Sequence, residues 1–372
     1  MNQSNKKTIL LVGGGTGGHS IPLLLLYKKL TTEHSDISVK IIGSDSELDH
    51  RIFDGVEDFV PLKSGKLHRR EHWRNLREAI KMISGFREAR RLLRELSPIM
   101  IFSKGGFISL PVIYWAKRLH IPYSIHESDI EMGEANKYAA SNAENIYVGF
   151  PVKNYPVEHK DRIKFVGQMI DDKIVSVKKY DLFGFDSQKP VIFVTGGSQG
   201  AHSLNSAVFE SLSNLLLEYS IIHQVGSHDL DEAKMAADNL PAELRKNYFV
   251  RDFLEKENGN NMMGNAYSLA DLVVSRAGAT TLAEIALYKK PSILIPYQFA
   301  SDNHQQKNAE VLVEEGAAVM IKNDNLNKTE LTKTILNLMS DQSKRTKISD
   351  AVSNIFPRNA VSIISKEIME GR

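Results

Sequence analysis

Residues 8–19 read TILLVGGGTGGH, an apolar run that leads straight into a glycine-rich turn. The run has the length and composition of a buried β-strand, and a helical stretch follows the turn. Residues 191–200, VIFVTGGSQG, repeat this arrangement in the second half of the chain. Glycine allows positive φ and close approach to a ligand, and the helix behind such a turn offers free N–H groups to an anion. Each half therefore begins like a nucleotide-binding unit.

Short β-rich runs alternate with longer helical stretches along the rest of the chain, which predicts parallel sheets with crossover helices. We expect strands at residues 8–12, 38–42, 99–103, 123–126, 145–148, 191–195, 220–225, 248–250, 272–275, 292–295 and 318–321, and helices at 76–96, 204–219 and 282–289. The predicted fold class is α/β, with two Rossmann-like domains and a cleft between them. The expected domains are residues 1–166, residues 167–350 with a hinge near Gly167, and a C-terminal segment, 351–372, whose helix packs back on the first domain.

The composition is that of a soluble globular protein. The 372 residues suit two domains, and 42% of them are apolar and 25% charged. The absence of cysteine excludes disulfides, thiolate metal sites and a cysteine nucleophile, and it fits a reducing compartment. The apolar run after the basic start stops at Gly13, which is shorter than the core of a signal peptide, and no run approaches the ~20 residues of a membrane span. We expect a soluble or peripheral protein.

The first glycine turn formally matches the dinucleotide-binding fingerprint, with Gly13, Gly15 and Gly18 at its three positions. Three features oppose that interpretation: His19 follows at once, the turn has more glycine than the fingerprint needs, and the acidic residues after it (Glu33, Asp36) do not end a second strand. A tight turn without any ligand is the remaining alternative.

Five motifs appear in order along the chain: GGTGGH at 14–19, SKGGF at 103–107, HESD at 126–129, GGSQG at 196–200, and RAGA at 276–279 followed by Glu284. Together they resemble the MurG-type N-acetylglucosaminyltransferases of peptidoglycan synthesis, over about residues 8 to 320. The resemblance implies a GT-B fold with the acceptor on the first domain and the sugar nucleotide mainly on the second. It also implies inverting transfer of N-acetylglucosamine from UDP-GlcNAc to an undecaprenyl-diphosphate-linked muramoyl peptide (lipid I to lipid II), with no metal and no cofactor.

Inversion by direct displacement needs a base for the acceptor hydroxyl and stabilisation of the departing diphosphate. His19 is the candidate base, and the alternative is that it only orients the turn. The resemblance implies substrate contacts for Thr16, Gly17, Gly18, Asp129, Ser198, Leu254, Ala279, Thr280, Thr281, Leu282, Ala283, Glu284, His304, Gln305 and Asn308. Within this set, Glu284 would accept the ribose hydroxyls, Leu254 would pack against uracil, and the amides of Gln305 and Asn308 would bond the sugar.

The chain departs from the family pattern at several positions. Asp129 stands where the family commonly has Asn, a mild change, and Met132 and Glu134 replace the usual Pro and Leu on the acceptor side. More seriously, Asp171 stands where an arginine usually helps to bind the donor. An anion there should weaken diphosphate binding. Lys173 or Lys104 is the candidate substitute.

Residues 63–94 contain eleven Lys and Arg against three Glu, a net charge of +8, which implies an anionic partner. Apolar residues recur there at helical spacing, with cations alongside; the expected membrane contacts are Trp73, Leu76, Ile80, Arg69, Arg70 and Arg74. The alternative is an ordinary amphipathic helix whose apolar stripe faces the core. The membrane-embedded acceptor of the family favours a peripheral protein at the cytoplasmic face of the cell membrane. Nucleic acid is not expected, because no base-stacking platform accompanies the arginines.

No metal site is expected. Asp229 and Asp231 are interpreted as surface groups at a helix start, and His68 and His72 lie among arginines. Three alternatives to the peptidoglycan enzyme stay open: a related GT-B transferase with another UDP-sugar or lipid acceptor, an NAD-binding oxidoreductase, and a non-catalytic membrane-docked binding protein.

Overall fold

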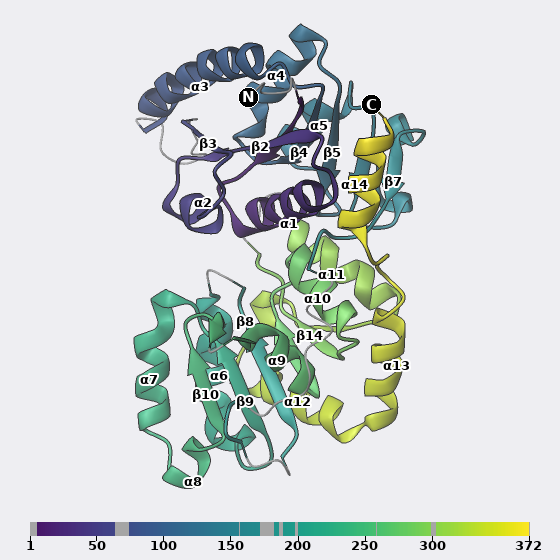
Figure 1. Cartoon of the computed structure of the whole chain (residues 1–372). Helices are drawn as coiled ribbons and strands as arrows, with labels where there is room; N and C mark the ends of the chain where they lie inside the picture. Colours follow the sequence, from purple (N-terminus) through teal and green to yellow (C-terminus); the bar gives the residue numbers. More distant parts are fainter. Residues whose placement is uncertain are drawn as a thin grey trace. The chain divides into compact units, whose positions relative to one another are not determined.

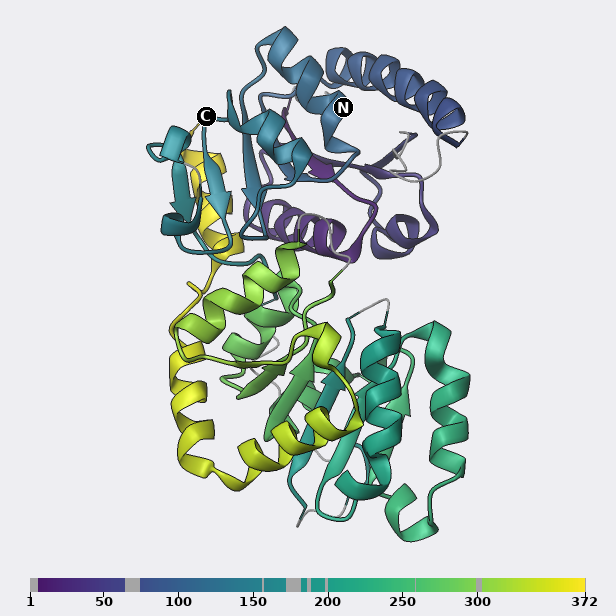
Figure 2. The ribbon, with the colours of Figure 1, turned by 180° about the vertical axis from the view of Figure 1, so that it is seen from behind.

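The computed structural model describes residues 6–63, 74–155, 157–171, 182–185, 189–197, 200–257, 259–298 and 303–371. For residues 74–80, 157 and 256 it describes the backbone alone. The chain forms two compact units, Met1–Ile170 together with Pro357–Arg372, and Asp171–Phe356 (Figures 1 and 2). Each unit is built on its own parallel sheet.

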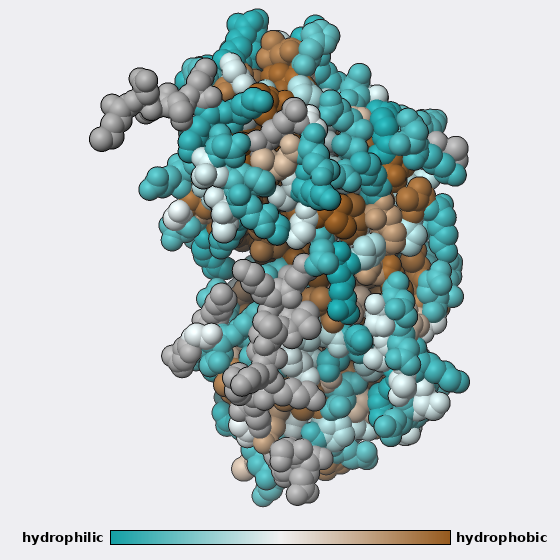
Figure 3. Space-filling model, turned by 45° about the vertical axis from the view of Figure 1, so that its right-hand side comes forward, coloured by the Kyte–Doolittle hydropathy of each residue, from teal (hydrophilic) through white to brown (hydrophobic). Residues whose placement is uncertain are grey.

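The described surface in Figure 3 is mainly hydrophilic, and its hydrophobic side chains form small, separate groups. Among the residues that the structure describes, no helix combines the length and the apolar character needed to cross a bilayer. Most of the large apolar side chains instead fill the cores of the two units.

The sheet of the first unit has seven strands in the order β3-β2-β1-β4-β5-β6-β7. They are β1 (Lys7–Gly13), β2 (Ile37–Ser44), β3 (Phe59–Leu62), β4 (Met100–Gly105), β5 (Tyr123–Glu127), β6 (Ile146–Val148) and β7 (Ile163–Phe165). Residues 9–12 of β1 are fully buried, as expected for a central parallel strand covered on both faces. Leu11 pairs with Ile41 of β2 and with Phe102 of β4. The strand order reverses between β1 and β4, which makes this the topological switch point of the unit.

The helices of this unit are α1 (Gly17–Glu33), α2 (Glu47–Ile52), α3 (Arg74–Leu96), α4 (Ser109–Leu119), α5 (Glu134–Ala140) and α14 (Ala360–Glu370), with 3-10 turns η1 (Val152–Asn154) and η2 (Val157–His159). Helices α1 and α14 pack on one face of the sheet, and α3 and α4 lie on the other (Figure 1). Glu367 of α14 accepts hydrogen bonds from Tyr147 Oη of β6 at 2.8 Å and from Lys164 Nζ of β7 at 2.6 Å. These bonds hold the C-terminal helix on the first unit.

The second unit has a six-stranded parallel sheet in the order β10-β9-β8-β13-β14-β15, with its switch point between β8 and β13. Its strands are β8 (Val191–Thr195), β9 (Ser220–Gln224), β10 (Tyr248–Arg251), β13 (Leu272–Ser275), β14 (Ser292–Leu294) and β15 (Val319–Met320), and β11 (Lys256–Glu257) and β12 (Asn260–Asn261) form a separate antiparallel pair. Its helices are α6 (His202–Leu215), η4 (Ser227–Asp229), α7 (Leu230–Asp238), α8 (Ala242–Arg245), α9 (Met262–Leu269), α10 (Ala279–Leu287), α11 (His304–Glu314), η6 (Asn323–Asn325), α12 (Lys328–Ser340) and α13 (Gln342–Val352).

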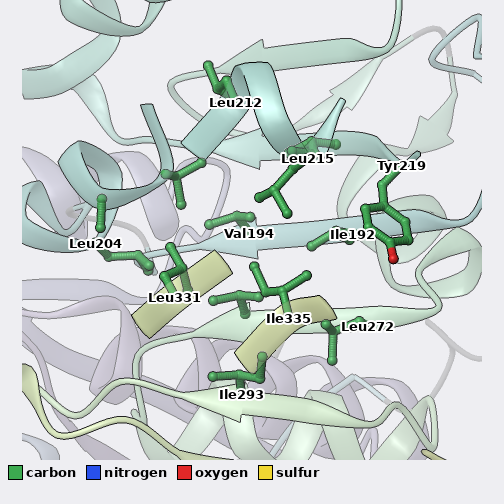
Figure 4. Close-up of a cluster of buried hydrophobic side chains, with 14 of the residues drawn as sticks. Ile192, Val194, Leu204, Leu212, Leu215, Tyr219, Leu272, Ile293, Leu331 and Ile335 are labelled. Carbon is green, nitrogen blue, oxygen red and sulfur yellow. The ribbon is translucent and has the colours of Figure 1, made fainter. Parts of the chain in front are cut away.

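The core of the second unit lies between β8 and the helices α6 and α12, which pack side by side (Figures 2 and 4). β-Branched Ile192 and Val194 come from the strand, Leu204 from α6, and Leu331 and Ile335 from α12. Ile192 and Val194 follow the preference of β-branched side chains for strands, and Leu204 and Leu331 follow that of leucine for helices.

All eleven strands expected from the sequence are present, with ends shifted by a few residues. Four others were not predicted. β3 contains Pro61 and β7 has three residues, and each lies at an edge of its sheet, where a strand is less apolar and proline is tolerated. β11 and β12 have two residues each, too few for a periodic signal.

Candidate functional site

In the first unit, the loops that follow β1 and β4 meet at the switch point. A Cβ placed on Gly106 would lie 3.1 Å from the carbonyl oxygen of Gly14, and one on Gly13 would lie 3.1 Å from Lys104 Cβ. Gly15 and Gly106 have φ of +83° and +82°, a conformation that favours glycine. Ligands of open α/β sheets bind in the crevice at such a position.

A fully buried carboxylate, Asp49 of α2, holds the first glycine turn. Its Oδ2 accepts hydrogen bonds from the N–H of Gly15 (2.9 Å) and of Ser44 (2.8 Å), and the hydroxyls of Ser20 and Ser44 also donate to the carboxylate. A Cβ on Gly14 would lie 2.3 Å from the same Oδ2. The density of glycine in the turn is thus explained partly by the protein's own carboxylate. Asp49 was not predicted from the sequence.

As expected, neither Glu33 nor Asp36 ends the second strand of the first unit: Glu33 ends α1, and Asp36 precedes β2. The second strand was expected to end at Ile42, but β2 continues to Ser44, and Asp45 follows it directly. Asp45 pairs with His50 Nε2 at 3.0 Å. Two contacts hold the end of β2: Ser44 pairs with Leu62 of β3, and its N–H donates to Asp49 Oδ2.

Asp49→Ala is expected to lower the free energy of unfolding of the first unit by about 3–5 kcal/mol, because four donors lose a buried acceptor. Both tryptophans of the chain, Trp73 and Trp115, belong to this unit, so urea unfolding followed by tryptophan fluorescence measures it selectively. The matched control is Asp49→Asn, whose carbonyl oxygen still accepts the two N–H groups and should cost much less. Equal losses in the two variants would contradict this role.

His19 lies in the first turn of α1, half-buried beside the SKGGF loop. Its Nδ1 is 2.8 Å from Thr16 Oγ1, and a Cβ on Gly106 would lie 3.4 Å from the same nitrogen. Burial and, less strongly, the nearby charge of Lys104 together lower the pKa of His19 to about 4, against the opposing effect of Asp49. The imidazole is therefore neutral near pH 7 and has a nitrogen that can accept a proton. Thr16, Gly17 and Gly18 surround the same helix start, and their N–H groups lie in the turn whose donors have no intrahelical acceptor.

Lys104 is a buried cation at the end of β4, 2% exposed, whose Nζ donates to Ser128 Oγ at 2.5 Å. Burial lowers its pKa to about 8, while Glu127 and Asp129 act in the opposite direction. At pH 7 most of Lys104 is therefore protonated, and its burial leaves a positive charge beside the glycine turn that water screens little.

Glu127 shapes the HESD loop that faces this lysine. Its Oε1 accepts from the N–H of Asp129 at 3.0 Å, and its Oε2 accepts from the N–H of Gly133 at 3.0 Å and from Asn136 Nδ2 at 2.9 Å. Burial raises the pKa of Glu127, Asp129 raises it further, and Lys104 and the hydrogen bonds oppose the shift. Asp129 itself is half-buried, and its carbonyl oxygen accepts from Tyr155 Oη at 2.9 Å.

In the second unit, a glycine turn follows β8 and the RAGA turn follows β13. Gly197 and Gly200 have φ of +81° and +74°, and Ser198 lies outside the described residues. Arg276 is buried and joins three segments: Nη1 donates to the Ile295 carbonyl at 3.0 Å and to Asn323 Oδ1 at 2.9 Å, and Nη2 donates to Ser203 Oγ at 2.7 Å. Burial lowers its pKa to about 10, so it remains a cation that fixes the turn.

Glu284 lies in the second turn of α10 and is half-buried. Tyr267 Oη donates to its Oε2 at 2.9 Å, and the Tyr267 ring stacks on Tyr288 with centroids 5.2 Å apart. Burial raises the pKa of Glu284 to about 7, and the hydrogen bond from Tyr267 opposes this shift. Tyr267 was not recognised from the sequence. Asp171 also lies near this group, because its charge contributes to the raised pKa of Tyr288.

The first turn of α10 contains Ala279, Thr280 and Thr281, and its N-cap, Gly278, supplies no side-chain cap. The helix start therefore keeps N–H groups without an intrahelical partner. Leu282 and Ala283 are buried and support the helix from the core side.

Leu254 is buried in the loop after β10, and its N–H donates to Gln224 Oε1 at 3.1 Å. Gln224 Nε2 in turn donates to the carbonyl of Gly197 at 3.2 Å. Gln224, which the sequence analysis missed, thus connects the Leu254 loop with the glycine turn.

The amides of the predicted sugar loop bond the protein's own backbone. Asn308 is fully buried, and its Nδ2 donates to the carbonyl of Ala277 at 3.2 Å. Gln305 Oε1 accepts from the N–H of Tyr297 at 2.9 Å, and His304 begins α11 in a half-buried position. This loop therefore supports the RAGA turn as well as being a candidate sugar site.

Of the expected membrane contacts, Arg69, Arg70 and Trp73 lie outside the described residues, and Arg74, Leu76 and Ile80 lie in α3 without described side chains. Farther along α3, Ala89, Leu92 and Leu93 face the core. The opposite side exposes cations and also Ile83, which is 54% exposed. Arg90 lies over the Trp115 ring at 4.8 Å. The described part of α3 has both the core-facing stripe and an exposed basic face.

Comparisons with known proteins agree with this architecture. The sequence model of the glycosyltransferase family 28 N-terminal domain matches residues 9–148, and that of the family's C-terminal domain matches residues 191–363. A UDP-N-acetylglucosamine–N-acetylmuramyl-(pentapeptide) pyrophosphoryl-undecaprenol N-acetylglucosamine transferase of Clostridium botulinum is 33% identical over 363 residues, covering 94% of this chain and 97% of the relative. A protein of the same name from Clostridium novyi is 31% identical over 370 residues, covering 97% and 99%.

The crystal structure of Acinetobacter baumannii MurG has a TM-score of 0.76 at 24% identity, covering 98% of this chain and 99% of that one. A UDP-N-acetylglucosamine 2-epimerase has a TM-score of 0.68 at 13% identity, covering 98% and 96%. At these identities the likeness concerns the fold alone. It confirms the predicted GT-B class with two Rossmann-like units.

Proposed function

The chain belongs to glycosyltransferase family 28, and on that premise we propose that it transfers N-acetylglucosamine from UDP-GlcNAc to an undecaprenyl-diphosphate-linked N-acetylmuramoyl peptide. The observation that supports the proposal is the position of Glu284, a half-buried carboxylate one turn into the helix that follows β13 at the switch point of the second unit. Open α/β sheets bind ligands at such a point. Membership of this family decides against the oxidoreductase alternative.

The proposed donor site lies in the second unit. The N–H groups at the start of α10 suit the diphosphate, because a helix N-terminus combines free donors with the positive end of the helix dipole. Glu284 would accept the ribose hydroxyls, and Leu254 would pack against the uracil. Gln305 and Asn308 would bond the sugar hydroxyls after exchanging the backbone bonds that they make in the free protein. Ser198 and His304 complete the set carried over from the family.

The proposed acceptor site lies in the first unit. The N–H groups of Thr16, Gly17 and Gly18 would hold the acceptor's diphosphate beside the buried charge of Lys104. The acceptor hydroxyl oxygen attacks the anomeric carbon as the bond to UDP breaks, and the hydroxyl proton passes to His19. This single displacement inverts the anomeric centre and releases UDP. Asp129 would contact the acceptor from the HESD loop.

Asp171 is expected to weaken donor binding, as its charge lies near Tyr288, which stacks on the tyrosine bonded to Glu284. Lys173, a candidate to replace the family arginine, lies outside the described residues. Asp171→Arg should therefore lower the KM for UDP-GlcNAc.

Transfer of labelled N-acetylglucosamine to a purified lipid-linked muramoyl peptide tests the proposal. We expect one UDP released for each sugar transferred. Release of UDP with another polyprenyl-linked acceptor, and none with the muramoyl peptide, would favour a related transferase with a different acceptor. No transfer from UDP-GlcNAc to any lipid acceptor would contradict the proposal.

We further propose that the protein binds peripherally to an anionic cytoplasmic membrane surface through α3. Replacing Arg87, Arg91 and Arg94 together with glutamine is expected to weaken binding to anionic liposomes by about two orders of magnitude at low salt, since each cation near the surface contributes ~1 kcal/mol. The matched control replaces three exposed lysines of the second unit, Lys328, Lys333 and Lys347. If both triple variants lose the same amount of binding in a liposome sedimentation assay, the effect comes from net charge alone and not from α3.

A further inference from the structure

In the described part of the chain, His202, Asp229 and Glu232 form a cluster of metal-ligating side chains that includes none of the proposed substrate contacts. His202 is the first residue of α6, Asp229 ends η4, and Glu232 lies in the first turn of α7. Their ligand atoms all lie within 4.8 Å of one another. The side chains become neighbours only through the fold, because the histidine and the acids come from different helices.

The distances suit a single small cation. His202 Nδ1 lies 3.0 Å from Asp229 Oδ1 and 3.9 Å from Glu232 Oε2. A divalent transition metal with bonds of about 2.0–2.2 Å holds its ligand atoms roughly 3–4.4 Å apart. The side chains of His202 and Glu232 are 71% and 47% exposed, so both can adjust their rotamers and water can occupy the remaining positions.

Asp229 differs from an ordinary surface acid. The predicted helix start at Asp229 and Asp231 is confirmed, but the prediction that Asp229 is a surface group was wrong. Its side chain is 11% exposed, whereas that of Asp231 is 96% exposed. It occupies the N-cap position of α7, yet its side chain makes no capping bond to that helix. An N-cap aspartate usually accepts from the second or third N–H of its helix. Here the carboxylate is directed toward His202 instead.

A chain of buried side chains orients this carboxylate. Asn205 Nδ2 donates to Asp229 Oδ2 at 2.6 Å, and Asn205 Oδ1 accepts from His223 Nε2 at 3.0 Å. His223 Nδ1 accepts from Tyr248 Oη at 3.0 Å. Burial lowers the pKa of His223 to about 3, so the ring stays neutral. Its Nε2 therefore acts only as a donor and its Nδ1 only as an acceptor. Supports of this kind behind a ligand typically orient it and raise its affinity for a metal.

We propose that His202, Asp229 and Glu232 bind one divalent transition-metal ion of the zinc class. One imidazole and two carboxylates suit zinc, nickel, cobalt or manganese better than magnesium or calcium, which prefer sets made only of oxygen ligands. The bound ion would join the start of α6, directly after Gly200, to the η4–α7 segment. It would therefore stiffen the turn that follows β8.

Zinc titration of the full chain, by calorimetry and by thermal unfolding, tests this proposal with zinc chloride as the probe. We expect one zinc ion per chain and a higher Tm, and at least a tenfold loss of affinity in His202→Ala and in Glu232→Gln. His228→Ala is the matched control, as His228 is exposed and lies next to Asp229 in sequence outside the cluster; it should bind like the wild type. Magnesium at the same concentration should change neither signal.

Unchanged zinc affinity in His202→Ala would overturn the proposal, as would an absence of zinc binding to the wild type at roughly 100 μM. Equal binding of magnesium would overturn the choice of metal. Asp229→Asn is informative only if it folds, and His202→Ala, at a largely exposed position, decides the question without it.

Discussion

Glu284→Gln is expected to weaken UDP-GlcNAc binding by roughly 10- to 100-fold, because a charge-assisted hydrogen bond contributes about 1.5–3 kcal/mol and the amide cannot accept both ribose hydroxyls. The glutamine oxygen can still accept from Tyr267 Oη, which now donates to Glu284 at 2.9 Å. The variant should therefore keep the local structure while losing the ligand contact.

The same substitution is expected to stabilise the free second unit at pH 8. Burial raises the pKa of Glu284 from 4.5 to about 7, so folding favours the protonated carboxyl. The stabilisation is complete below the unfolded value and is lost as the pH rises through about 7. Ionisation at pH 8 therefore costs up to about 3 kcal/mol, less to the extent that solvent reaches the half-buried group. Glutamine carries no charge at either pH.

Calorimetric unfolding at pH 5 and pH 8, with UDP-GlcNAc titrations across the same range, measures both effects. Donor affinity of the wild type should rise up to tenfold per pH unit below about 7 as Glu284 ionises, and the variant should lack this dependence. Glu314→Gln, at an exposed position of α11, is the matched control. If Glu284→Gln binds the donor as the wild type does, Glu284 is not the ribose ligand.

The central strands and glycine turns of both units were predictable, because a strand buried on both faces leaves an uninterrupted apolar run. Residues 8–12 and 191–195 show this signal, and both are strands in the structure. The edge strands β3 and β7 have one open side and fewer constraints on composition, so they have no comparable signal.

The sequence did not predict which polar residues form long-range hydrogen bonds with one another. Asp49 bonds Gly15 across 34 positions, and Tyr267 bonds Glu284 across 17. Many Asp and Tyr residues had the same local appearance, and only the fold selects the ones that meet. Glu284 was predicted as a site residue from its motif, whereas the tyrosine that donates a hydrogen bond to it was not predicted.

His19→Ala is expected to lower kcat by about 10²–10⁴-fold, because proton transfer to the proposed base is lost. The affinity for UDP-GlcNAc should change little, since the proposed donor contacts lie in the second unit. His34→Ala, at the opposite end of α1, is the control. Initial rates with the lipid-linked acceptor and donor titrations separate kcat from binding.

The low pKa of His19 limits how well it can act as a base. A histidine whose pKa is about 4 is neutral from pH 5 to pH 8 but accepts a proton weakly, so it should produce no acid limb in kcat/KM over that range. The two phosphates of a bound acceptor would raise its basicity, opposing the effect of Lys104. Lys104→Met should raise the pKa of His19 in an NMR titration, because the charge that lowers it is removed. Retained turnover in His19→Ala would exclude the histidine as the base.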